Sequence, residues 1–247
     1  MVESNWLEKR LLLAQEIAGG LSGWYQMQIS QRLEDLSGED SAQLVIAQII
    51  NAQQDFRPKA SQPFKGHEES QKRMDIALVG RSKDTSLYGA IEVKWANQSS
   101  NAANLRLSLI QDILRLSVVP THSLGANFLV FGGKKEKIES MFNEEGRDFH
   151  KTRESRQIFN RLLAREVLGD GKAKVSDITK EYPTSTSRLP SATSLGSDKT
   201  IITRLLAKAG SEIGDQVRGQ VYVWQCQWGR GRKKKLTATD PESSSTS

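Results

Sequence analysis

Residues 73–79, RMDIALV, and residues 88–96, YGAIEVKWA, determine how the rest of the chain can be arranged. Both are short apolar runs rich in strand-forming residues, and the polar segment 80–87 between them has the composition of a turn. We therefore predict two strands, 74–79 and 88–95, joined as a hairpin.

The second strand carries two charged side chains. Because side chains alternate along a strand, Glu92 and Lys94 project from the same face. The opposite face consists of Ile91, Val93 and Trp95. We expect the apolar face to be buried and the charged pair to be presented.

Asp75 in the first strand supplies a second carboxylate. In a hairpin the two strands are neighbours, so Asp75 can approach Glu92 closely enough for both to hold one cation. Two unpaired carboxylates on a central sheet are costly without such a partner. Oxygen ligands suit Mg²⁺ or Mn²⁺, which can activate a water and neutralise charge on a phosphate. Lys94 would orient that water or stabilise the negative charge.

These motifs resemble the PD-(D/E)xK nucleases, which share the restriction-endonuclease-like fold. The resemblance covers about residues 33–133, with Met74 in place of the motif's proline. It implies an αβββαβ core, dependence on a divalent metal and hydrolysis of phosphodiester bonds. It also implies that Asp75 and Glu92 are metal ligands and that Lys94 is the catalytic lysine.

Further family positions fall on the flanking helices. Members often have a glutamate on the helix before the sheet, and Glu39 is the best match, with Glu34 as second choice. Many have a glutamine on the helix after the lysine strand, and Gln111 matches it, with Arg115 where a tyrosine often follows. An acid in the first turn of a helix is also favoured by the helix dipole. Gln111 and Arg115 equally fit an ordinary solvated helix face, or Arg115 a phosphate contact.

The remaining pattern predicts an α/β protein with a mixed sheet flanked by helices. The expected helices cover 6–18, 41–53, 104–116, 135–142 and 154–168, with a strand at 126–131. Ser37 and Asp40 have the spacing of a capping box for the helix at 41–53. An extra C-terminal helix at 199–208 and strand at 219–228 complete the prediction.

The composition divides the chain into four regions. They are a nuclease-like domain over 1–168, a Ser/Thr/Pro/Gly-rich loop or linker over 169–198, a helix and strand extension over 199–228 that packs on the core or a partner, and a basic, then Ser-rich, disordered tail over 229–247. The strand at 219–228 places Tyr222 and Trp224 on one face, which fits a core or subunit contact better than stacking on bases.

The chain of 247 residues has 35 basic and 29 acidic side chains, a net charge of +6. Much of the excess lies near the C-terminus, and it indicates a polyanionic partner. The candidates for nucleic-acid contacts are Arg73, Arg115, Arg230, Arg232, Lys233, Lys234 and Lys235, with Arg57, Lys59 and Lys72 as further backbone contacts. The run at 230–235 is equally explained as a solvated tail.

Several function classes are disfavoured. The chain has 3 histidines without metal-ligand spacing and a single cysteine, Cys226, which argues against a zinc site or an intrachain disulfide framework. No phosphate-binding glycine loop is visible. No export signal or membrane-length apolar run is visible either, so we expect a cytoplasmic protein.

The sequence thus favours a Mg²⁺-dependent DNA endonuclease, with Mn²⁺ as an alternative metal. Restriction, phage defence and DNA repair all fit, and a homodimer would pair two active sites for cutting both strands. A catalytically inactive nucleic-acid-binding module and a partner-docking subunit with the same fold remain as alternatives.

Overall fold

The computed structural model describes residues 2–63, 73–81, 86–97, 101–119, 125–143, 153–183 and 198–229. The helices are α1 (Val2–Ser30), the 3₁₀ helix η1 (Glu34–Leu36), α2 (Glu39–Ala52), α3 (Ala102–Val118), α4 (Lys135–Asn143), α5 (Arg153–Leu162) and α6 (Val175–Glu181). The strands are β1 (Phe56–Pro63), β2 (Arg73–Gly80), β3 (Leu87–Ala96), β4 (Ala126–Lys134), β5 (Asp170–Lys174), β6 (Thr200–Ile213) and β7 (Gln216–Trp228).

Within these residues, seven strands form one mixed sheet in the order β1-β2-β3-β4-β7-β6-β5. Strands β3 and β4 are parallel and are connected through α3, whereas the other neighbours are antiparallel. The order α2-β1-β2-β3-α3-β4 is αβββαβ along the chain. The predictions of a β2–β3 hairpin and of a mixed α/β sheet flanked by helices are confirmed.

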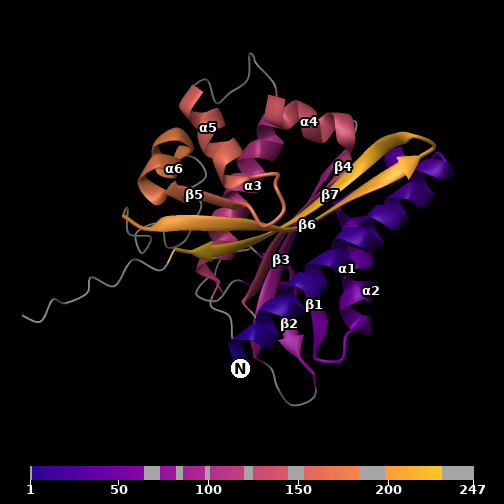
Figure 1. Ribbon diagram of the computed structural model, residues 1–247, viewed down its shortest axis with the longest axis horizontal. Helices are drawn as coiled ribbons and strands as arrows, with labels where there is room; N and C mark the ends of the chain where they lie inside the picture. Colours follow the sequence, from indigo (N-terminus) through magenta and orange to yellow (C-terminus); the bar gives the residue numbers. More distant parts are fainter. Residues whose placement is uncertain are drawn as a thin grey trace, which may run out of the picture.

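Helices cover both faces of the sheet (Figure 1). Helices α1 and α2 pack on the face that carries Ile91, Val93 and Trp95, and together they form one core. Helices α3 to α6 pack on the other face, against β4 and the aromatic side of β7. Alternation along β3 therefore buries one face under α1 and α2 and turns Glu92 and Lys94 towards α3.

The C-terminal extension is a correction to the sequence prediction. Residues 200–213 form strand β6, not a helix at 199–208, and β6 pairs with β7 along its length. The register shifts between Leu205 and Ala207, so that Leu205 belongs to the α3 core and Leu206 and Ala207 to the α1 core. This bulge breaks the alternation of apolar residues, which made the strand resemble a helix in the sequence.

The linker assigned to 169–198 also contains regular structure. Strand β5 pairs with the edge of β6, and α6 buries Val175 and Ile178 in the core. β5 was missed because its sequence, DGKAK, is polar on the exposed side of an edge strand. The predicted helix at 154–168 ends at Leu162, and residues 184–197 lie outside the described part of the chain.

The N-terminal elements differ from the sequence prediction as well. Helix α1 continues past Ala18 through several glycines, and at Gly20 a Cβ atom would lie 2.6 Å from Ile49 Cδ1, so glycine permits close contact between α1 and α2. The expected capping box is wrong, because Gly38 is the N-cap of α2 and Ser37 Oγ donates back to Leu33 O at 3.5 Å.

Strand β1 lies at the edge of the sheet, and strand β7 lies in its interior. Strand β1 was not predicted, because its two prolines and polar residues are compatible only with an edge position. The aromatic face of β7 belongs to the core, where Trp224 and Tyr222 are buried, and it is not a surface for stacking on bases.

Candidate active site

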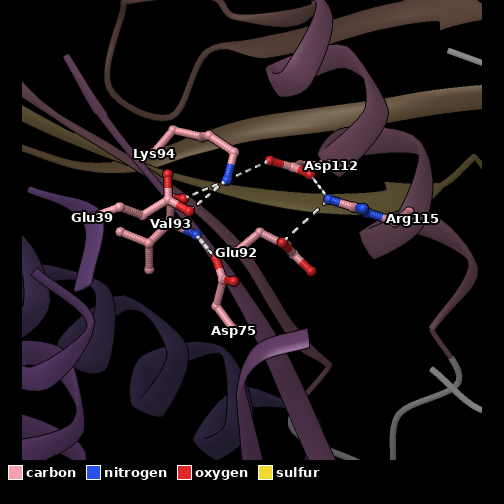
Figure 2. Close-up of polar contacts among 7 residues, drawn as sticks. All are labelled: Glu39, Asp75, Glu92, Val93, Lys94, Asp112 and Arg115. Carbon is pink, nitrogen blue, oxygen red and sulfur yellow. Dashed lines mark hydrogen bonds and ion pairs between the residues drawn. The ribbon is translucent and has the colours of Figure 1, made fainter. Parts of the chain in front are cut away.

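The candidate site lies where strands β2 and β3 cease to pair. The last pair of their ladder on this side is Ile76 with Ile91, and Asp75 and Glu92 follow directly beyond it. Asp75 Oδ2 accepts a hydrogen bond from the backbone N–H of Val93 at 2.7 Å. The carboxylate is therefore fixed against β3 by a backbone donor, beside Glu92 (Figure 2).

Lys94 occupies the centre of a group of oxygen atoms. Its Nζ lies 3.0 Å from Glu39 Oε1, 2.8 Å from Val93 O and 3.4 Å from Asp112 Oδ2. The Lys94 side chain is only 12% exposed. A side chain from α2, a backbone carbonyl of β3 and a side chain from α3 thus hold the ammonium group in one position.

Glu39 is the acid that reaches this group from the first turn of α2. Burial raises the pKa of Glu39, although the nearby Lys94 ammonium opposes the shift. Glu34, the second choice from the sequence, lines a different pocket with Tyr25 and Lys134. The structure therefore brings Glu39, and not Glu34, to Lys94.

Glu92 is the most strongly perturbed acid of the site. It is 1% exposed, and burial raises its pKa to about 8, while Arg115 opposes this and Asp75 adds to it. Its Oε2 lies 3.4 Å from Arg115 Nη2. Its Oε1 is buried and has no hydrogen-bond partner among the described residues. Burial thus favours the protonated form of Glu92, whereas a further cation nearby would favour the carboxylate.

Asp112 and Arg115 complete the cluster from α3. The Asp112 side chain is 0% exposed and forms ion pairs with Arg115 and Lys94 (Figure 2). Sequence reasoning missed Asp112, although one signal was present: it stands among buried apolar residues of α3, where a carboxylate needs a charged partner. Arg115 turns into the site, so the interpretation as a solvated helix face is wrong for this residue.

The remaining predicted residues are not part of the network of hydrogen bonds and ion pairs around Lys94 and Glu92. Gln111 is partly exposed on α3, next to Asp112 in the chain. Arg73, Arg57 and Lys59 are exposed on β2 and β1. The residues outside the described ranges are Lys72, Arg230, Arg232, Lys233, Lys234 and Lys235.

The site contains more acidic than cationic side chains. Four acidic side chains, Glu39, Asp75, Glu92 and Asp112, lie around two cationic ones, Lys94 and Arg115. Among the described residues, no group of three or more His, Cys, Asp or Glu side chains is arranged to hold a metal ion. Mg²⁺ is commonly held by only one or two carboxylates, with water and substrate as the other ligands. The excess of acid and the unpartnered Glu92 Oε1 fit such an ion.

In comparisons with known proteins, no family model, no curated protein and no solved structure matches the chain. Among the described helices, including the long α1, none is long and apolar enough to cross a membrane.

Proposed function

We propose that the chain is a metal-dependent nuclease that hydrolyses phosphodiester bonds in DNA. One observation carries this proposal: Glu39, Asp75, Glu92 and Lys94 come together from α2, β2 and β3 at the end of the β2–β3 ladder. The αβββαβ order of elements and the resemblance of residues 73–79 and 88–96 to the PD-(D/E)xK motif add support.

Asp75 and Glu92 would hold the divalent ion. The hydrogen bond from Val93 N fixes one oxygen of Asp75, and Glu92 Oε1 has no protein partner in the described structure. Bound there, Mg²⁺ or Mn²⁺ would supply a cation that favours hydroxide over water and neutralises charge on the phosphate.

Lys94 would position the attacking water and stabilise negative charge. Glu39, Val93 O and Asp112 restrict its Nζ, so the ammonium is held in place before substrate arrives. Asp112 and Arg115 act through their neighbours: Asp112 holds Lys94, and Arg115 contacts Glu92.

The biological setting is part of the same proposal. An endonuclease of this kind would serve restriction, phage defence or DNA repair, and it would act as a homodimer if it cuts both strands. A reducing compartment such as the cytoplasm suits the free, buried Cys226.

The test is cleavage of supercoiled plasmid by the full chain with Mg²⁺, Mn²⁺ or EDTA. We expect nicking with either metal, none with EDTA and a loss of at least about 100-fold in Lys94→Ala, the scale of one catalytic group. Lys9→Ala is the control, because Lys9 is also ion-paired, to Asp55 at 2.6 Å, but belongs to α1, which contributes none of the site residues drawn in Figure 2. Cleavage that is undiminished in Lys94→Ala would contradict the residue assignment.

A second candidate is a binding module that has this site but does not catalyse. The ion pairs favour it, because Arg115 already contacts Glu92 and Lys94 is already held by two acids. In that case DNA binding would be the same with metal or EDTA, and no variant or metal would give cleavage.

A further inference from the structure

The hairpin of β1 and β2 carries three exposed cations near Asp75: Arg57, Lys59 and Arg73, here called the basic row. Among the described residues none of the three forms an ion pair with an acid. All three are exposed, so they present three positive charges at the β1 edge of the sheet.

The register of the hairpin places the row along the strand of Asp75. Arg57 pairs with Val79 and Lys59 pairs with Ala77, the next positions on the face that Asp75 shares by alternation. Pro63 pairs with Arg73, so Arg73 lies beyond Asp75 at the other end. Each step of two residues spans about 7 Å, so cations stand on both sides of the carboxylate.

This face of β1 is turned away from the helices that pack on the strand. Phe56, the residue before Arg57, is buried in the core under α1 and α2, and side chains alternate from there. Arg57 and Lys59 therefore point away from that core, which agrees with their exposure.

We infer that the basic row binds the sugar-phosphate backbone of a nucleic acid on both sides of the bond at Asp75. An acidic centre repels a polyanion, and the flanking cations offset that repulsion while positioning successive phosphates. A regular series of negative charges along an extended chain is the ligand that such a row fits. The statement that the bond at Asp75 is the one cleaved rests on the proposed function.

The experiment measures binding, not cleavage. A fluorescein-labelled DNA duplex is titrated with the full-length protein in EDTA. The titration is repeated at salt concentrations from about 50 to 200 mM, because the affinity of a protein that contacts phosphates falls steeply over this range. The variant is Arg57→Gln/Lys59→Gln/Arg73→Gln. The matched control is Lys172→Gln/Lys174→Gln/Lys180→Gln, which removes three exposed positive charges from β5 and α6 at the opposite edge of the sheet.

We expect the variant to weaken binding about tenfold or more and to lower the slope of log K against log salt by about 3, one for each phosphate contact. The control should leave the slope within about 1 of the wild type. Thermal unfolding checks that both variants fold. An unchanged slope in the variant, an equal loss in the control, or no binding by the wild type would each overturn the inference.

Three further outcomes bear on this inference, and the last two separate it from the proposed function. Polyglutamate that competes as well as DNA of equal charge would show a general anion surface and would overturn it. Loss of slope without any plasmid cleavage would support the basic row and contradict the hydrolase. Cleavage with an unchanged slope would support the hydrolase and contradict the basic row.

Discussion

Raising the pH in the absence of divalent cations is expected to destabilise the protein through Glu92. Its pKa is about 8 in the folded chain, raised from an ordinary value of 4.5 mainly by burial. Between these values the folded state binds more protons than the unfolded state, so the free energy of unfolding falls as the pH rises. The free energy of unfolding begins to fall near pH 4.5 and stops falling above about pH 8.

The size of the effect follows from the same two values. At about 1.4 kcal/mol per pKa unit, the difference corresponds to an upper limit of about 5 kcal/mol. Reorganisation around the charged carboxylate reduces this limit, and we expect a loss of about 2 to 4 kcal/mol. A divalent cation at Glu92 favours the carboxylate, so the stabilisation by Mg²⁺ should grow with pH.

The assay is urea unfolding from about pH 5 to pH 9, with EDTA or Mg²⁺, for the wild type and Glu92→Gln. The neutral amide keeps the shape of the side chain and removes its titration. Glu139→Gln, on an exposed carboxylate of α4, is the control. A wild type whose stability has the same pH dependence as that of Glu92→Gln would refute the reasoning.

Three further predictions concern the ion pairs of Asp112 and the packing of the core. Asp112→Asn should lower the free energy of unfolding by about 3 kcal/mol, because it removes the buried carboxylate that pairs with both Lys94 and Arg115; a loss under about 1 kcal/mol in urea unfolding would contradict this. Gly133→Ala should cost at least about 3 kcal/mol, since Gly133 has φ 133° and the new Cβ would meet the backbone of Ala96; Gly214→Ala, at a turn with open space, is the control and should cost less. Trp224→Ala should cost about 3 to 5 kcal/mol through a cavity between α3 and β7, and an unchanged melting temperature would argue against this core.

The hairpin and its charged face were predictable because they depend on neighbours in the chain. Alternation along one strand is local, so the shared face of Glu92 and Lys94 could be derived before the structure. Asp75 could be placed beside them because a short turn joins the strands. The contact of Glu39 with Lys94 depended on the resemblance, because the start of α2 is brought to β3 by tertiary packing.

Other features depended on contacts that no local pattern contains. Asp112 reaches Lys94 only because α3 packs across β3, and the family template drew attention to Gln111 instead. The bulge in β6 concealed a strand, and β1 was hidden by residues that only a sheet edge accepts.

Binding of Mn²⁺, followed by the electron paramagnetic resonance signal of the free ion, tests the central claim most directly. The account predicts a site on the wild-type chain that binds more tightly as the pH rises and that is lost in Asp75→Asn and in Glu92→Gln. Binding that is equal in all three proteins would contradict it.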